Sequence, residues 1–437
     1  MGMSFSDYAP DESLVRRVAI EKNTPIVDLI LKTIDELSGP GAARATLLGL
    51  CPVSEAAIRA SIECAKFLNF PLLFVATLNQ VDVDGGYTGL TQRDFVKLVR
   101  RECEEIGYRG PAIIALDHGG PWLKDRHVAE RLGFEEAFER VKKSIEACIS
   151  AGYDLLHIDT TVDIWSKRPS METVVERTVE LIEHAEAFRE EQGAPRLSYE
   201  VGTEEVHGGI TSPRLFEEFI RKLKAKLRER GLESVWPCFI VGNVGTFLAP
   251  DNRFNPEKAK ALVKIAGSYG LYVKGHYTDY VSNPEDYPKA GMGGANVGPE
   301  LAHAEYEALE ELDRLERILY RRGRIGNPSG IMRRLDEAIV RSGRWRKWLT
   351  EEERALSFEE LAEDRRRWLL ATGARYVLST PEIRGARARL HENLKAFGVR
   401  SEEVVASRLR DVIWKYVQAF NLKDLLHRLS GRLIEKA

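Results

Sequence analysis

Several classes of protein are excluded by what the sequence lacks. No apolar run reaches the roughly 18 residues that a membrane-spanning helix requires. The chain carries 64 Lys and Arg against 67 Asp and Glu, a net charge of −3, without the basic excess of a nucleic-acid-binding protein. Its five cysteines form no CxxC pair, which argues against a disulfide framework and a cysteine zinc site. We therefore expect a cytoplasmic protein that binds neither membranes nor nucleic acids.

The composition that remains is that of a large globular protein. Hydrophobic residues make up 43% and charged residues 30% of the 437 positions, which is ample material for a core. The first residues, MGMSFSDYAPDESLVRR, have no apolar stretch after a basic start and do not resemble a secretory signal. Arginine is frequent and many predicted helix faces carry mixed charge, a pattern that indicates a thermophilic source.

Short apolar runs alternate with longer amphipathic segments along most of the chain. Runs this apolar suit a parallel sheet that helices cover on the outside. Eight such runs over about 280 residues predict a (β/α)8 barrel of TIM-barrel type. The alternative is an open doubly wound sheet, but the first run ends in LGLCPVSEAA without a glycine-rich dinucleotide fingerprint. The predicted strands are 45–50, 71–77, 112–117, 155–159, 197–202, 238–243, 271–276 and 293–298.

The sequence divides into three regions. We expect a helical lead-in over 1–44, the barrel over 45–322, and a helical C-terminal region over 323–437 that packs on the barrel. The arginine clusters of the last region are interspersed with acidic residues, which is typical of a solvated ionic face. Four tryptophans are expected to anchor its helices on each other or on the barrel, at positions Trp345, Trp348, Trp368 and Trp414.

Polar side chains follow almost every predicted strand. A barrel of this type carries its chemistry where strands end and the following loops begin. So many polar groups would be a costly way to build a core, because each would need a partner if buried. We therefore predict an active or binding site there, with candidates Asn79, Gln80, Asp117, His118, Asp159, Glu200, Glu204, Asn243, His276, Thr278, Asp279 and Asn296.

The chemistry of this set points to a metal. His118, Glu200 and His276 follow three different strands and could converge on one divalent ion. Imidazole with carboxylate suits Zn, Mn, Co or Ni better than Mg or Ca. The alternative is that both histidines are structural. Asp117 and His118 are adjacent, so they point to opposite sides in a regular strand and both reach the site only if the strand has ended. His157, inside a strand, is expected to be a packed histidine.

The segment GGYTGLTQRDF allows two interpretations. Its glycines could free backbone N–H groups to cradle a phosphate ahead of a helix, although the GK[ST] of a Walker motif is absent. Thr91 is an equally good N-cap for that helix. We expect a loop that both caps the helix and lines the site, which agrees with both interpretations.

Six motifs together resemble a known family. They are NQVDVDGGYTGLTQRDF, LDHGGP, LHIDTT, YEVGTEE, GHYTDY and NVGPELAHAEYEALEEL. They resemble the tagatose-bisphosphate aldolase Z-subunit family, whose members include non-catalytic aldolase subunits and tagatose/fructose 4-epimerases. The resemblance implies a barrel of class II aldolase type, with a helical C-terminal part, over most of the chain. It also leads us to expect a homo-oligomer.

The resemblance also implies roles for individual residues. Asp117 matches a catalytic acid/base aspartate, and His118 and His276 match metal ligands. Gly245 stands where class II aldolases have a third metal histidine, and Glu200 stands where the family is usually apolar, so the chain resembles a divergent member. We further predict acid/base groups at Asp159 and Glu204 and substrate contacts at Asn79, Gln80, Tyr87, Asn243, Thr278, Asp279 and Asn296, although Asn243 lies in a VGN segment where the family usually has QPG.

Two main functions follow from this resemblance. The first is a metal-dependent 4-epimerase of a ketohexose or its phosphate, which opens and recloses the C3–C4 bond by retro-aldol and aldol steps. The alternative is a non-catalytic partner that stabilises the catalytic subunit of a class II tagatose-bisphosphate aldolase. An aldolase outright is a third. The full set of polar strand ends favours catalysis, because a scaffold has no need of His118, Glu200 and His276 together.

Overall fold

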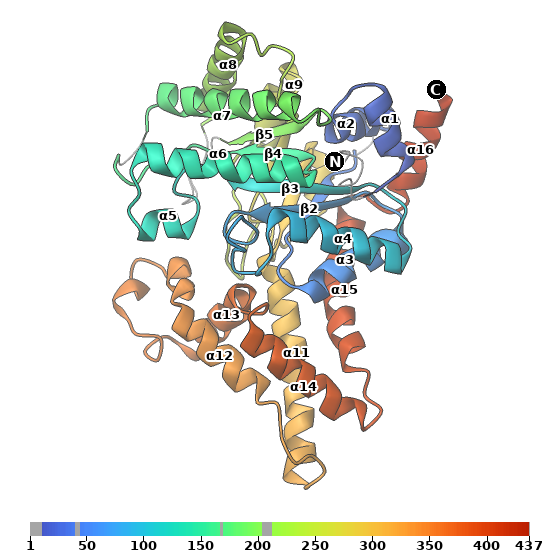
Figure 1. Ribbon diagram of the computed structural model, residues 1–437, viewed down its shortest axis with the longest axis vertical. Helices are drawn as coiled ribbons and strands as arrows, with labels where there is room; N and C mark the ends of the chain where they lie inside the picture. The colour runs from blue at the N-terminus through green and yellow to red at the C-terminus, as the bar shows by residue number, and fades with distance from the viewer. Residues whose placement is uncertain (1–10, 40–43, 167–168, 203–211, 437) are drawn as a thin grey trace.

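A closed barrel of eight parallel strands forms the centre of the molecule (Figure 1). The computed structural model describes residues 11–39, 44–166, 169–202 and 212–436. The strands follow one another in chain order, and β1 pairs with β8 to close the barrel. The prediction of a (β/α)8 barrel is confirmed. The strands are β1 (Leu47–Leu50), β2 (Leu72–Thr77), β3 (Ala112–Gly119), β4 (Leu155–Ile158), β5 (Ser198–Gly202), β6 (Phe239–Val241), β7 (Tyr272–Gly275) and β8 (Gly294–Val297).

Amphipathic helices surround the strands and bury their apolar faces against them. Side chains at the connections fix where several of these helices begin. Ser54 accepts a hydrogen bond from the backbone N–H of Ala57, and Thr91 forms a capping box with Asp94. The helices between strands are α3 (Glu55–Leu68), α4 (Gln92–Ile106), α5 (Asp125–Ala129), α6 (Phe134–Ala151), α7 (Met171–Glu191), α8 (Pro213–Glu229), α9 (Pro256–Ser268) and α10 (Asp286–Ala290).

The amino end of the barrel, where the strands begin, is covered by helices from both ends of the chain. They are α1 (Leu14–Glu21), α2 (Ile26–Leu37) and α16 (Leu425–Glu435), which pack together in the structure (Figure 1). Arg16 of α1 pairs with Asp154, the residue just before β4. The hydroxyl of Ser198, at the start of β5, donates to Asp28 of α2. These contacts close this end of the barrel with polar side chains that have partners.

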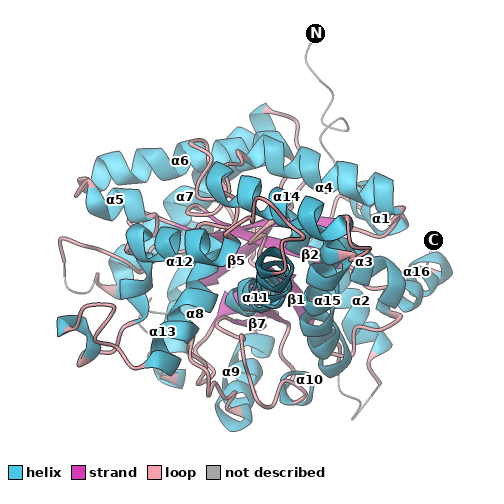
Figure 2. Ribbon diagram, turned by 90° about the horizontal axis from the view of Figure 1, so that it is seen from below, coloured by secondary structure: helices cyan, strands magenta, loops and turns pink. Residues whose placement is uncertain are grey.

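The C-terminal helices extend from the opposite end. Helix α11 (Pro299–Arg321) starts directly after β8, descends from the barrel in Figure 1, and stands near the centre of the view in Figure 2. Helices α12 (Ile331–Ser342), α13 (Glu363–Gly373) and α14 (Pro381–Lys395) gather around it. Helix α15 (Ser401–Ala419) then returns along α11 and α3. The C-terminal region is thus helical and packs on the barrel through α11 and α15.

Residues 331–380, here called the cap, lie against the carboxyl end of the barrel. Between α12 and α13 the cap contains the 3₁₀ turns η2 (Arg344–Trp348) and η3 (Glu353–Ala355), and η4 (Ala374–Tyr376) follows α13. Leu248 and Tyr280, from the loops after β6 and β7, pack into the apolar cluster of the cap. The cluster holds Trp345, Trp348 and Trp368, while Trp414 contacts Phe67 of α3. Trp345, Trp348 and Trp368 therefore anchor the helices as the sequence predicted, whereas Trp414 is 44% exposed.

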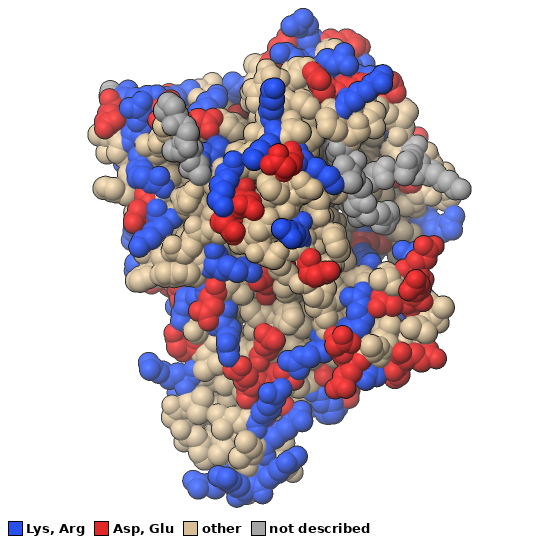
Figure 3. Space-filling model, turned by 180° about the vertical axis from the view of Figure 1, so that it is seen from behind, with Lys and Arg blue, Asp and Glu red and all other residues tan. Residues whose placement is uncertain are grey.

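The outer surface carries charges of both signs. On the face seen from behind, basic and acidic side chains are interspersed over most of the area, and basic side chains dominate only at the lower tip (Figure 3). Among the described residues, no helix combines the length and apolar character that a membrane span would need.

Candidate active site at the carboxyl end of the barrel

Four metal-type side chains meet inside the carboxyl end of the barrel. Asp117 and His118 belong to β3, His157 to β4, and His276 directly follows β7. One potential ligand atom from each lies within 4.8 Å of those of the others, and only His118 is more than slightly exposed. The structure thus brings together two of the three predicted metal ligands and adds Asp117 and His157.

A bulge in β3 places two neighbouring residues in the same cluster. The register between β3 and β4 shifts between Leu116 and Gly119, and His118 has φ +51°. A left-handed residue inside a strand turns its side chain away from the regular alternation. Asp117 and His118 therefore both reach the site, although they are adjacent. This resolves the question that the sequence left open.

Each of the three imidazoles has a carboxylate oxygen at one ring nitrogen. His118 Nδ1 lies 2.8 Å from Asp159, His157 Nδ1 lies 3.1 Å from Asp117, and His276 Nε2 lies 3.1 Å from Glu200. For His118 and His276, a carboxylate that accepts one ring N–H leaves the other nitrogen with a free lone pair, which is the usual arrangement of a metal-ligating histidine. His157 Nδ1 instead accepts a hydrogen bond from the backbone N–H of His118 at 3.1 Å, which holds the ring in place.

Two of these imidazoles keep a buried nitrogen without a partner among the described residues. They are His157 Nε2 and His276 Nδ1. Burial lowers the pKa of His276, which favours the neutral ring that can bind a metal. Burial works to raise the pKa of Asp117, but His118 and His276 outweigh it and hold that pKa well below its usual range. The donor set of three imidazoles and one carboxylate fits a divalent transition metal.

Glu200 stands beside the cluster and not within it. One carboxylate oxygen contacts His276, and the other accepts a 2.6 Å hydrogen bond from Lys274, which is almost fully buried. Burial alone would raise the pKa of Glu200, but Lys274 and the imidazoles of His157 and His276 hold it at about 2. The structure thus places Glu200 as a partner of His276 and Lys274, and its predicted role as a ligand stays a prediction. Lys274 escaped the sequence analysis, although it precedes His276 by two residues in an otherwise apolar strand.

Asp159 has the same relation to His118. One of its oxygens contacts His118 Nδ1, and the other accepts hydrogen bonds from the backbone N–H and the hydroxyl of Thr161. Burial raises and His118 lowers the pKa of Asp159, with a net value of about 2. The structure therefore places this carboxylate behind His118. Its predicted role in acid/base catalysis is not tested by these contacts.

The glycine at the end of β5 keeps this region open. A Cβ on Gly202 would lie 3.1 Å from His157 Nε2 and 3.7 Å from the carboxyl carbon of Asp159. Gly245, which stands where the resemblance expects a third metal histidine, has φ +88°. A histidine would be strained there. His157, on another strand, restores the count of three imidazoles.

The predicted substrate contacts fall into two groups. Most of them are occupied by internal hydrogen bonds of the loops, as in the cases of Asn79, Gln80, Asn243, Thr278 and Asp279. Asn296 is different, because both polar atoms of its buried amide lack a partner among the described residues. Tyr87 packs edge-on against Tyr376 of the cap. Glu204 lies outside the described residues.

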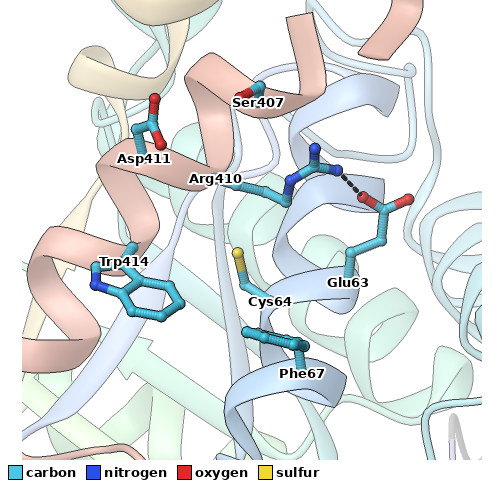
Figure 4. A pocket seen from close by; sticks show the side chains of 7 residues that line it. All are labelled: Glu63, Cys64, Phe67, Ser407, Arg410, Asp411 and Trp414. Atoms are coloured by element: carbon cyan, nitrogen blue, oxygen red, sulfur yellow. Dashed lines mark hydrogen bonds and ion pairs between the residues drawn. The ribbon is translucent and has the colours of Figure 1, made fainter. Parts of the chain in front are cut away.

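A pocket on the outer wall is unrelated to these residues. It has a volume of about 420 Å³ and lies between α3 and α15, where Arg410 pairs with Glu63 (Figure 4). Its lining consists of Glu63, Cys64, Phe67, Ser407, Arg410, Asp411 and Trp414. The polar groups at the strand ends remain the candidate active site.

The closed parallel barrel with a histidine–carboxylate cluster at its strand ends defines a (β/α)8 barrel protein with a candidate metal site. The family described as D-tagatose-1,6-bisphosphate aldolase subunit GatZ/KbaZ-like matches residues 36–421. The chain belongs to this family, as its motifs predicted. It is also 29% identical to a D-tagatose 6-phosphate 4-epimerase of Agrobacterium fabrum (strain C58) over 291 residues, which is 62% of this chain and 67% of that protein.

Solved structures share the fold. One is a probable tagatose 6 phosphate kinase from Sinorhizobium meliloti 1021, with a TM-score of 0.67 and 24% identity, covering 89% of this chain and 98% of that chain. Another is the fructose-bisphosphate aldolase of Campylobacter jejuni, with a TM-score of 0.54 and 13% identity, covering 91% of this chain and 95% of that chain. At these identities the likeness concerns the fold alone.

Proposed function

We propose that the chain is a metal-dependent ketohexose 4-epimerase that interconverts tagatose and fructose, or their phosphates, by opening and reclosing the C3–C4 bond. The observation that carries this proposal is the buried Asp117 carboxylate among three imidazoles, of which His118 and His276 each have a further carboxylate partner. The related 4-epimerase of Agrobacterium fabrum supports the reaction type. The description of the family names an aldolase subunit, which agrees with aldol chemistry.

The residues of the cluster have different roles in this proposal. We assign the three imidazoles of His118, His157 and His276 to the ion, with Asp117 beside them as the proton acceptor. Asp159 and Glu200 orient His118 and His276. When bound, a divalent ion supplies Lewis-acid polarisation of the ketose carbonyl. Zn, Mn, Co and Ni all suit this donor set.

Asp117 is the best placed proton acceptor in the described part of the site. Its carboxylate takes the proton of the C4 hydroxyl, the C3–C4 bond breaks, and its electron pair moves toward the C2 carbonyl. The new aldehyde turns and accepts the same electron pair on its other face, and Asp117 returns the proton to the C4 oxygen. Atoms and charges balance without a second substrate. The cap lies over this end of the barrel, which would help retain both fragments.

A first experiment asks whether the chain is catalytic by itself. The purified protein with Mn, Co, Ni or Zn should interconvert tagatose and fructose, or their 6-phosphates, without another subunit. The family description favours one competing function, a non-catalytic aldolase subunit. If no ketohexose or ketohexose phosphate is converted with any of these metals, yet the chain stabilises a catalytic aldolase subunit, that competing function replaces the proposal.

A second experiment distinguishes two sets of metal ligands. His157→Gln should lower the metal content per chain more than Glu200→Gln, because the proposal takes His157 as a ligand and Glu200 as an orienting group. His184→Gln is the matched control, since His184 pairs with Glu146 on the outer helices. Elemental analysis after gel filtration measures all three. A greater loss of metal in Glu200→Gln than in His157→Gln would restore Glu200 as the ligand.

A further inference from the structure

The cap brings a buried arginine to the carboxyl end of the barrel. Arg375 lies on η4 and is 6% exposed. Its guanidinium donates to the backbone oxygen of Thr372 at 2.6 Å and to the hydroxyl of Tyr376 at 2.9 Å. It also lies against the ring of Trp348, 5.1 Å from the centroid. All of these partners are neutral.

A buried cation without a carboxylate is an unusual arrangement. Within the described ranges, no carboxylate oxygen lies within ion-pair distance of Arg375. Asp279 acts on Arg375 electrostatically, but its Oδ1 accepts the backbone N–H groups of Gly298 and Glu300 instead. Buried charges are normally paired, because desolvation is expensive. The guanidinium therefore has unused capacity for an anion.

A second arginine of the cap has unused capacity in the same place. Arg344 of η2 pairs with Asp125 through Nη2 at 3.1 Å, while its Nη1 is buried without a partner among the described residues. Its guanidinium lies over two rings, 5.3 Å from the centroid of Tyr87 and 5.0 Å from that of Tyr376. Tyr376 thus stands between the two arginines, since it also accepts a hydrogen bond from Arg375.

The hydroxyl of Tyr376 completes the set of donors. Its oxygen accepts hydrogen bonds from the indole N–H of Trp348 at 3.1 Å and from Arg375. Both bonds use oxygen lone pairs, so the hydroxyl hydrogen is left to donate. Arg375, Arg344 and Tyr376 thus offer donors only, which is the chemistry that a phosphate or carboxylate requires.

This set belongs to the same end of the barrel as the histidine cluster. Tyr87, on the loop after β2, contacts Tyr376 and Arg344. Cys51, which follows β1, interacts electrostatically with both Asp117 and Arg375. The charges of Asp117 and Arg375 thus both act on the same thiol at this end of the barrel. A substrate held at the cluster would direct one end toward the cap.

We propose that Arg375, Arg344 and Tyr376 bind an anionic group at the end of the substrate remote from the reacting carbons, a phosphate monoester or a carboxylate. The inference rests on the proposed function and deepens it, because it assigns the preference for an anionic ketohexose over a free one to three residues of the cap. The C-terminal cap then selects the substrate, while the barrel performs the reaction.

The first test measures anion binding without catalysis. Inorganic phosphate should bind the purified chain and raise its melting temperature. Arg375→Met should weaken phosphate binding at least tenfold as measured by calorimetry. The phosphate affinity of Arg375→Lys should lie between those of Arg375→Met and the native chain. Arg367→Met is the control, because Arg367 is an exposed cap arginine paired with Glu310. Equal phosphate affinity in Arg375→Met and the native chain would overturn the proposal.

Folding of the variants provides an independent check. Removing an unpaired buried charge should leave the melting temperature of ligand-free Arg375→Met equal to or above the native value, whereas a purely structural arginine would lower it. If Arg375→Met fails to fold, Arg375 is structural and the proposed subsite is wrong.

Tyr376→Phe keeps the ring and both aromatic contacts but removes the hydroxyl. It should therefore weaken phosphate binding severalfold, and unchanged phosphate binding would remove Tyr376 from the subsite.

Turnover separates this inference from the proposed function. The native chain should convert a ketohexose 6-phosphate or a ketohexuronate with a kcat/KM at least tenfold above that of the free ketohexose, and the better of the two identifies the anion. Arg375→Met should reduce that preference through KM. Turnover without any preference for an anionic substrate would contradict the anion subsite but not the proposed epimerase activity. Phosphate binding that depends on Arg375, without turnover of any sugar, would contradict the epimerase activity but not the anion subsite.

Discussion

Two buried arginines at opposite ends of the barrel have opposite surroundings. Arg16, at the amino end, is 8% exposed and pairs with Asp11 at 2.8 Å and with Asp154 at 2.5 Å. Arg375, at the carboxyl end, is 6% exposed and has only neutral partners among the described residues. The charge of Arg16 is paired with carboxylates of the protein, so Arg16 stabilises the fold. The charge of Arg375 has no carboxylate partner among the described residues and is available to bind an anion.

The same contrast extends to the other polar groups at the two ends. At the amino end, the hydroxyl of Ser198 donates to Asp28 at 2.7 Å. At the carboxyl end, His157, His276 and Asn296 each keep a buried polar atom without a partner in the described chain. An unpartnered buried polar atom destabilises the native state by about 1–3 kcal/mol. The unpartnered polar atoms therefore destabilise the carboxyl end of the barrel, where the active site is expected.

The largest effect on rate is expected for Asp117→Asn. The amide keeps the size of the side chain but cannot accept the proton of the C4 hydroxyl, so turnover should fall by about 10²–10⁴. Asp154→Asn at the amino end is the matched control and should leave the rate per folded molecule unchanged. Steady-state kinetics at saturating metal measures both. A loss of less than tenfold in Asp117→Asn would remove this residue from the catalytic role.

The largest effect on stability is expected at the other end. Arg16→Met leaves Asp154 buried without its cation, which should lower the free energy of unfolding by about 3–5 kcal/mol. The neighbouring Arg17 is exposed on the same helix. Arg17→Met should therefore change the free energy of unfolding by less than about 0.5 kcal/mol. Denaturant unfolding of the metal-free proteins provides the values. Similar values for both variants would show that the amino end does not depend on this pair.

Asp279 should make stability depend on pH. Burial raises the pKa of Asp279 to about 6, and Glu300 adds to the rise while its backbone hydrogen bonds and Arg375 oppose it. The folded pKa is above the unfolded one, so the native state holds the proton more tightly, and its stability falls as pH rises from about 4 to 6. The difference corresponds to about 3 kcal/mol. Asp279→Asn should flatten the curve of unfolding free energy against pH in this window, and an unaltered slope would contradict the assignment.

Much of the fold could be predicted because it depends on local pattern. Seven strands lie wholly inside the predicted apolar runs, since each run is too apolar to have a solvated face. The eighth, β3, continues to Gly119 because of the bulge at His118. That bulge requires a left-handed residue inside a strand, and no sequence pattern around His118 indicates it.

The parts of the site that sequence analysis missed depend on contacts between distant segments. His157 joins the cluster only because the bulge in β3 turns His118 toward it. Glu200 is set apart from the cluster by Lys274, a residue 74 positions later. Arg375 is one of many arginines in the C-terminal region and is distinguished from them only by its neutral surroundings once the cap packs on the barrel. Residue types at strand ends could thus be predicted, but their pairing could not.

The smallest effect on stability is expected where a buried amide already lacks partners. Asn296→Ala removes two unpartnered polar atoms together with some packing, so the free energy of unfolding should stay within about 1 kcal/mol of the native value. Gln92→Ala is the matched control, because Gln92 is equally buried but donates to Asp82 at 2.9 Å, and its loss should cost about 1–3 kcal/mol. Gly49 shows how closely Asn296 is surrounded, since a Cβ there would lie 2.2 Å from its side-chain oxygen. If Asn296 serves the substrate, its variant should instead raise KM for the sugar. A stability loss in Asn296→Ala as large as in Gln92→Ala, with an unchanged KM, would place Asn296 among the structural amides and weaken the contrast between the two ends of the barrel.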